Sequence, residues 1–235
     1  VVLFADTYMK FHDPGIGNSA KSLLEYLGFE VHVFQKGCCQ RPAISHGLLE
    51  HAKNEGVKTF TFLEPFLKAG IPILVCEPSC ATSLKDDLAD LMEDEKWLEY
   101  SHLIFLLEDF LAGEMAKGNL EKEIKFKSGS YLLHAHCHQK SIFTSASVHQ
   151  LFNQQSNVVL AEINSGCCGM AGSFGYEKEH YAVSEKIGNL SLLPEIRKAS
   201  EDQVIIAEGF SCRHQIEHFT GRKPIHWVEA VDTNH

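Results

Sequence analysis

The sequence predicts an α/β protein made of two duplicated, Rossmann-like halves, each built on a parallel sheet and related by pseudo-symmetry. Apolar runs typical of buried strands alternate with helical patterns along the chain, which favours parallel sheets covered by helices. The order of strands, helices and cysteines in residues 1–118 recurs in residues 128–235. With 235 residues, the chain is long enough for two domains of about 110 residues each.

Six short apolar segments carry the strand pattern, and the segments between them carry helical periodicity. The predicted strands are 1–6, 29–34, 71–77, 131–136, 157–163 and 203–209. The clearest predicted helices are 19–28, 46–56, 101–116 and 181–193, and 85–100 reads as an acidic helical face exposed to solvent.

The cysteines mark the duplication. Cys38 and Cys167 each open a Cys-Cys pair and lie 129 residues apart, while Cys80 and Cys212 lie 132 residues apart. A polar linker, 117–130, separates the two halves. We therefore expect a first cysteine-rich repeat in residues 1–118 and a second in 128–235. The first is degenerate, because Thr7 replaces Cys137 and Gln40 replaces Gly169.

Composition narrows the classes of function. The net charge of −10 and the absence of a Lys/Arg cluster argue against nucleic-acid binding. No apolar run is long enough for a transmembrane segment. The chain has eight cysteines but no mark of a secreted protein, so we expect a reduced, cytoplasmic protein. This expectation includes peripheral association with a membrane. Because the first residues already read as a strand, we also expect a fragment of a longer polypeptide.

Four cysteines of the second half are the candidate metal ligands. Cys137, Cys167, Cys168 and Cys212 each follow a predicted strand, and parallel strands bring their carboxyl ends to one sheet edge. The spacing C-x₂₉-C-C-x₄₃-C differs from a zinc knuckle. An adjacent pair crowds a single ion but can reach different irons, which favours an iron–sulfur cluster of the 4Fe–4S type. Zinc, another metal and inert buried thiols remain alternatives.

Further residues are assigned to the surroundings of this centre. Gly166 and Gly169 leave backbone N–H groups open to sulfur. His136, His138, Lys140 and Arg213 are candidates for hydrogen bonding or charge neutralisation around the ligands, and His134 alternates with the first two along the predicted strand end. No catalytic residue is identified.

A second, weaker site is predicted in the first half from Cys38, Cys39 and Cys80. Pro78 is typical of a first helical turn, so we expect Cys80 to lie near a helix N-terminus with a lowered thiol pKa.

The motifs resemble the cysteine-rich CCG domain of the heterodisulfide reductase B subunit and of the glycolate oxidase iron–sulfur subunit. The segments that carry the resemblance are "CCQRP", "GLL", "EPSC", "HCHQK", "CCGMAGSFGYE" and "GFSCR". They are most similar to the C-terminal part of fused FAD-linked oxidases that oxidise D-lactate or D-2-hydroxyglutarate. One departure is that Gln215 and Ser83 stand where the reductase subunit has the last cysteine of C-x-x-C.

The resemblance implies an oxidoreductase in which this chain is an iron–sulfur electron-transfer domain. Flavin and ferredoxin-like domains would lie upstream and FAD would bind there, so this part alone is not expected to be active. The departure at Gln215 implies a four-ligand cluster. Two alternatives stay open: a metal-stabilised docking module without a redox role, and a thiol–disulfide reductase domain.

Overall fold

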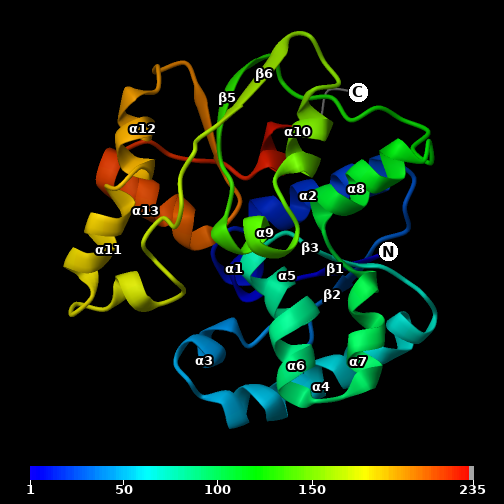
Figure 1. The fold of residues 1–235 in the computed structure, drawn as a ribbon. Helices are drawn as coiled ribbons and strands as arrows, with labels where there is room; N and C mark the ends of the chain where they lie inside the picture. Colours follow the sequence, from blue (N-terminus) through cyan, green and yellow to red (C-terminus); the bar gives the residue numbers. More distant parts are fainter. Residues whose placement is uncertain (233–235) are drawn as a thin grey trace. The chain divides into compact units, whose positions relative to one another are not determined.

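The computed structural model describes residues 1–232 and divides the chain into two compact units, Val1–Glu123 and Ile124–His235. Each unit contains one parallel sheet, with four strands in the first and three in the second (Figure 1). The α/β class with two Rossmann-like halves, predicted from the alternation of strands and helices, is therefore confirmed.

In the first unit, the strand order is β2-β1-β3-β4 and every neighbouring pair is parallel. The helices between the strands supply the long crossovers that parallel pairing requires. The elements are β1 (Val2–Phe4), α1 (Thr7–Phe11), α2 (Pro14–Tyr26), β2 (His32–Phe34), α3 (Arg41–Ser45), α4 (Leu49–Lys68), β3 (Ile73–Val75), α5 (Pro78–Thr82), the π-helix η1 (Ser83–Asp87), α6 (Leu88–Met92), α7 (Glu95–Tyr100), the 3₁₀ turn η2 (Ser101–Leu103), β4 (Ile104–Leu106) and α8 (Leu107–Ala116).

In the second unit, the strand order is β6-β5-β7, again parallel throughout. The central strand β5 pairs with the strand that follows it on one side and with the third strand on the other, as β1 does in the first unit. The elements are β5 (Gly129–His134), α9 (Cys137–Ile142), α10 (Ala146–Phe152), β6 (Val158–Glu162), the 3₁₀ turn η3 (Phe174–Tyr176), α11 (Tyr181–Gly188), α12 (Leu192–Lys198), β7 (Val204–Ala207), α13 (Phe210–Thr220) and the 3₁₀ turn η4 (Trp227–Ala230).

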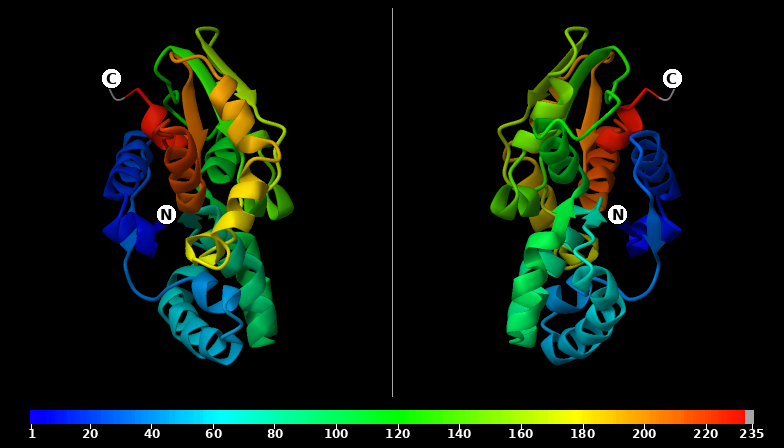
Figure 2. Two further views of the ribbon diagram at one scale, coloured as in Figure 1. Left: turned by 90° about the vertical axis from the view of Figure 1, so that its left-hand side faces the viewer. Right: turned by 90° about the vertical axis from the view of Figure 1, so that its right-hand side faces the viewer.

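Helices cover both faces of the second sheet. Helix α10 lies on one side and α12 on the other (Figure 1). Helix α11, which precedes α12 in the chain, lies on the same side as α12 (Figure 2). An aromatic group fills the core near α10: the Phe126 and Phe152 rings stack at 3.9 Å, and Tyr131 meets Phe152 edge-on at 5.2 Å. Because both faces are covered, the inner strand β5 carries consecutive apolar residues, Tyr131, Leu132 and Leu133, rather than an alternating pattern.

The helix predicted over 101–116 is partly wrong. Residues 104–106 form the edge strand β4, and α8 begins only at Leu107. The run "LIFLLEDFL" is compatible with both a helix and a buried strand, so periodicity alone does not locate the boundary between β4 and α8. The six predicted strands are all present, five of them shorter than predicted, while β5 begins two residues before the predicted start at 131.

Among residues 1–232, no helix combines the length and the apolar character that crossing a membrane requires.

Shortening Phe152 to alanine is expected to destabilise the protein by about 3–5 kcal/mol, because a fully buried ring is lost and a cavity remains. Urea unfolding followed by circular dichroism measures this change. Leu190→Ala is the matched control, since Leu190 is 82% exposed and its loss should change stability by less than about 0.5 kcal/mol. Equal effects of the two substitutions would contradict the packing described here.

Asp6 is a buried N-cap, and its carboxylate accepts hydrogen bonds from the amides of Tyr8 and Met9. Burial, and then the neighbouring Glu77, raise the pKa of Asp6 to about 6 despite these bonds. The folded protein therefore binds this proton more tightly than the unfolded chain does. Asp6 should then reduce stability as the pH rises from about 4 to about 6, by up to roughly 3 kcal/mol.

Asp6→Asn keeps an acceptor for the N-cap but removes the ionisation. The free energy of unfolding, measured from pH 4 to 7, should fall less steeply with pH in the variant than in the wild type. A variant curve parallel to the wild-type curve would show that Asp6 ionises normally in the folded state.

Candidate metal centre

The candidate ligands of the second unit are placed by the ends of its three strands. Cys137 opens α9 just after β5, and Cys212 lies in the first turn of α13 just after β7. Cys167 and Cys168 lie in the irregular segment that follows β6. Since the strands are parallel, all four residues are brought to the same edge of one sheet.

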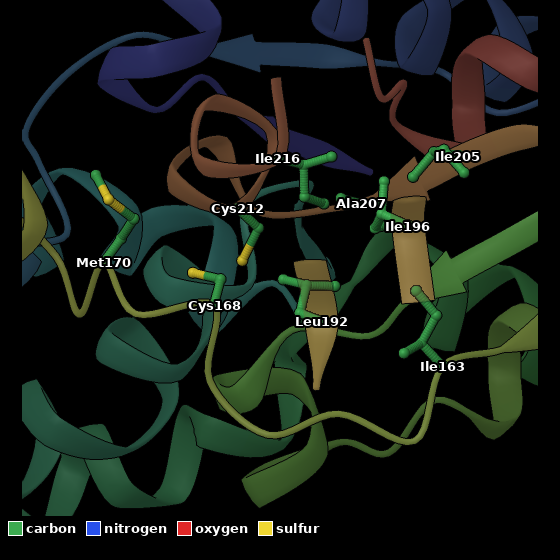
Figure 3. Close-up of a cluster of buried hydrophobic side chains, with 9 residues drawn as sticks. All are labelled: Ile163, Cys168, Met170, Leu192, Ile196, Ile205, Ala207, Cys212 and Ile216. Carbon is green, nitrogen blue, oxygen red and sulfur yellow. The ribbon is translucent and has the colours of Figure 1, made fainter. Parts of the chain in front are cut away.

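The four thiol groups form a continuous row. Cys137 contacts Cys167, Cys167 contacts Cys168, and Cys168 contacts Cys212 through their side chains. Figure 3 shows the Cys168 and Cys212 side chains with their sulfur atoms close together. Cys168 and Cys212 are buried, whereas Cys137 and Cys167 are partly exposed. The structure thus gathers the four predicted residues, which come from three separate segments.

A buried histidine lies beside the inner end of this row. A ring nitrogen of His134 and the sulfur atoms of Cys168 and Cys212 all lie within 4.8 Å of one another. His134 is the last residue of β5 and is fully buried. Its Nδ1 atom lies 2.9 Å from the hydroxyl of Ser165.

Backbone amides stabilise a thiolate at Cys167. Hydrogen bonds with Cys137 and Cys168, together with the amides of Gly169 and Ala171, lower the pKa of Cys167 against the opposing effect of burial. The Gly169 amide lies 3.3 Å from the Cys167 sulfur. Successive N–H groups directed at one sulfur are also the arrangement that favours a negatively charged metal–sulfur centre.

Cys212 is the second thiol whose pKa is lowered. Its hydrogen bond with Cys168 and the neighbouring His136 and His134 outweigh the effect of complete burial. Cys137 and Cys168 have raised pKa values, mainly because Cys137 is hydrogen-bonded to Cys167, and Cys168 to both Cys167 and Cys212. A metal that binds all four sulfurs would replace the protons still shared along the row.

The backbone of the loop that carries the Cys-Cys pair requires glycine at position 169 but not at position 166. Gly169 has φ +103°, and a Cβ atom there would lie 2.3 Å from the Ser184 carbonyl oxygen. Gly166 has ordinary φ and open space around it. The Gln215 amide holds the same loop by donating to the carbonyl oxygens of Cys168, at 3.1 Å, and Ser184, at 3.3 Å.

His136 holds the segment before α9. It is the N-cap of that helix, and its Nδ1 accepts a hydrogen bond from the His138 amide at 3.1 Å. Its ring packs so closely on Gly209 that a Cβ atom there would lie 2.2 Å from His136 Cδ2. The expected alternation of histidines along a strand end is wrong beyond His134, because β5 stops there and α9 starts at Cys137.

Lys140 and Arg213, the two cationic residues assigned to the surroundings of the centre, bind carboxylate and carbonyl groups of the protein. Lys140 lies 3.2 Å from the Glu162 carboxylate and donates to the Ser165 carbonyl at 3.1 Å. Arg213 is buried and donates to the carbonyl oxygens of Ala207 and Glu208 at the end of β7. Both side chains therefore fix the strand ends and loop around the thiols.

The first unit contains a related but different arrangement. Cys38 contacts Cys39, and the Cys39 and Cys80 sulfurs lie 2.9 Å apart. Thr7 hydrogen-bonds to Cys38, from the position that Cys137 has in the second unit. Ser83, three residues after Cys80, donates to the Cys39 carbonyl, as Gln215 does to that of Cys168.

The expectation of a lowered pKa for Cys80 is wrong. The hydrogen bond with Cys39 does lower it, but burial and the adjacent carboxylates Asp6 and Glu77 raise the pKa to about 11. Helix α5 spans only Pro78–Thr82, too short for its dipole to offset that negative charge. Cys38 and Cys39 also have raised pKa values, through hydrogen bonding among the thiols and burial.

Sequence reasoning missed three features of the site: the supporting hydroxyl of Ser165, the close approach of Gly209 to His136, and the contact between His134 and the thiols. Gly209 precedes α13 in the motif "EGFSC", so a required glycine could have been suspected there. Nothing in the local sequence indicates which histidine reaches Cys212.

Comparison with known proteins gives a family match over residues 131–217, to the model described as a cysteine-rich domain, CCG. Over 98% of its length, the chain is 24% identical to the C subunit of the anaerobic glycerol-3-phosphate dehydrogenase of Escherichia coli K12 and 25% identical to D-2-hydroxyglutarate dehydrogenase of Pantoea ananatis. It covers 58% of the first and 22% of the second. Lactate utilization protein A of an Exiguobacterium species is 23% identical over 81% of the chain and 80% of that relative.

The chain thus spans only part of the dehydrogenase relatives, which are larger proteins. The resemblance inferred from the motifs is confirmed, because residues 131–217 match the model of the cysteine-rich domain CCG.

Proposed function

We propose that the second unit binds an iron–sulfur cluster through Cys137, Cys167, Cys168 and Cys212 and transfers electrons within an FAD-linked oxidoreductase that acts on a D-2-hydroxy acid. The observation that carries the proposal is the continuous row of the four sulfur atoms at one sheet edge. Inert core cysteines have no reason to converge in this way from separate segments.

The donor set fits such a cluster. Cys167 and Cys212 are predisposed to be thiolates, and the Gly169 and Ala171 amides supply the N–H groups that metal–sulfur centres accept. When bound, a 4Fe–4S cluster supplies one-electron transfer at a potential set by its charge, hydrogen bonds and exposure. Burial of Cys168 and Cys212 shields the inner side from water, while the partly exposed Cys137 and Cys167 leave the outer side open to a redox partner.

The relatives support the oxidoreductase setting. Two of them are named as parts or forms of dehydrogenases, and one of these names a D-2-hydroxy acid. We infer that a flavin domain and ferredoxin-like domains of the same polypeptide or complex deliver electrons to this unit. The substrate would then bind outside the chain, in the flavin portion.

Zinc is the second candidate, because one observation favours it. His134, Cys168 and Cys212 are close enough for a single ion, which would suit a metal-stabilised docking module. A thiol–disulfide reductase centred on the first unit has less support: the Cys39 and Cys80 sulfurs lie 2.9 Å apart, but both residues are buried and both have raised pKa values, which suppress the reactive thiolate.

Loss of one ligand should abolish the cluster. After anaerobic reconstitution with iron and sulfide, Cys167→Ser and Cys212→Ser should lower iron affinity by more than the roughly 100-fold that the loss of an outer hydrogen-bond partner can cost. Iron and acid-labile sulfide analysis with EPR measures this loss. Cys76→Ala, a buried cysteine of the first unit, is the control and should keep full iron content.

Retention of iron and sulfide in both serine variants would remove the basis for the proposal. Wild-type protein that takes up zinc, but neither iron nor sulfide, would favour the docking module instead.

Two glycines of the same loop should respond differently to alanine. Gly169→Ala should cost about 1–3 kcal/mol of stability and most of the bound iron, because the backbone at φ +103° is strained for alanine and the Ser184 carbonyl blocks its Cβ. Gly166→Ala should keep both, since its Cβ meets open space. Thermal unfolding and iron analysis of the pair give the comparison, and a loss of iron in Gly166→Ala alone would reverse the assignment.

A further inference from the structure

The cluster proposed above uses sulfur ligands only, but the site also contains a buried imidazole beside two of the sulfurs. His134 is fully buried at the end of β5. Within the described part of the chain, its Nε2 atom is buried without a hydrogen bond of ordinary geometry, and the ring interacts with the Cys212 thiol. Leaving a buried polar atom without such a bond is costly, so its retention calls for a specific role.

Ser165 holds the Nδ1 side of the ring, and in the tautomer with its proton on Nδ1 the available nitrogen is Nε2. Its hydroxyl lies 2.9 Å from Nδ1, and its carbonyl is held by Lys140 at 3.1 Å. A proton on Nδ1 that is donated to Ser165 leaves the Nε2 lone pair free and fixes the ring plane. Histidines that bind metals are supported in this same way, by an acceptor on the second nitrogen.

Distances place that lone pair among the sulfurs. The His134 nitrogen and the Cys168 and Cys212 sulfurs lie within 4.8 Å of one another. Nitrogen and sulfur donors on one tetrahedral metal are roughly 3.5–3.8 Å apart, given bond lengths of about 2.0–2.3 Å. Small side-chain rotations are therefore enough to let the imidazole bind the metal atom that either of these two sulfurs would hold.

The duplicated first unit provides an internal comparison. Counting back from Thr7 and Cys137, the position of His134 is occupied by Phe4, which is buried and stacks on Phe34 at 5.9 Å. An apolar ring therefore fits this place in the fold. The imidazole occurs in the unit that has all four cysteines, and the phenyl ring occurs in the unit that lacks one of them.

We propose that His134 is an additional ligand of the metal centre in the second unit, bound through Nε2 beside Cys168 and Cys212, with Ser165 as its positioning residue. This inference rests on the proposed function, because it assumes that a metal centre forms there.

Pulsed EPR of the full chain tests the ligand directly. The protein is prepared with ¹⁵N-labelled histidine, loaded anaerobically with iron and sulfide, and reduced. A histidine nitrogen bound to iron should give a strong hyperfine coupling, with the isotope shift expected for ¹⁵N. His134→Phe, which copies Phe4 of the first unit, should abolish that coupling. His226→Asn is the matched control, because His226 is another buried histidine of this unit. It is the N-cap of η4, a role that asparagine can retain.

Ser165→Ala provides a second variant in case His134→Phe fails to fold. It should keep the coupling to the bound nitrogen, change the signal of the remote nitrogen, and weaken iron binding by about 10–100-fold. A merely structural role for His134 predicts no nitrogen coupling in any of these proteins.

The outcomes separate the two proposals. Wild-type protein with iron and sulfide, but without a strongly coupled histidine nitrogen, overturns the ligand role of His134 and leaves the proposed function intact. A coupling that persists in His134→Phe also overturns it, by assigning the signal to another histidine. Wild-type protein that binds neither iron nor sulfide overturns the proposed function itself, and this inference with it.

Discussion

Parallel pairing of β5 with both β6 and β7 is the constraint on which the candidate site depends. It aligns three strand ends, and each end continues directly into a segment that carries one or two cysteines. The sulfurs meet although Cys137 and Cys212 are far apart in the chain, because sheet register rather than local sequence sets their distance. Any change that shifted β7 by one residue against β5 would turn α13 and move Cys212 out of the row.

The irregular loop after β6 provides what helices and strands cannot, namely backbone N–H groups directed at sulfur. Regular elements use these groups for their own ladders. The backbone at Gly169, with φ +103°, belongs to neither a helix nor a strand, and the amides of Gly169 and Ala171 hydrogen-bond to Cys167 instead. Gln215 holds the loop from α13, so the helix that presents Cys212 also fixes the position of Cys168.

The sequence predicts the features of this structure that follow from apolar patterns, but it does not predict the features that depend on contacts between distant side chains. Alternating apolar runs located six of the seven strands, and the strand ends correctly grouped the four cysteines in space. Strand β4 was missed because three apolar residues directly before a helix carry no period of their own. The contact of His134 with Cys212 and the packing of His136 on Gly209 depend on side-chain directions across the sheet, which local sequence does not encode.

The two units share a fold but differ in the charge around their thiols. In the second unit, His134 and His136 lie near Cys212 and, with the Cys168 hydrogen bond, lower its pKa. In the first, Asp6 and Glu77 lie near Cys80 and help to raise its pKa, and Phe4 stands where the second unit has His134. An iron–sulfur cluster on thiolates is an anion, so neighbouring carboxylates oppose it while imidazoles favour it. The electrostatics of this chain therefore favour the proposed cluster in the second unit over one in the first, where Thr7 stands in place of Cys137 and carboxylates lie near Cys80.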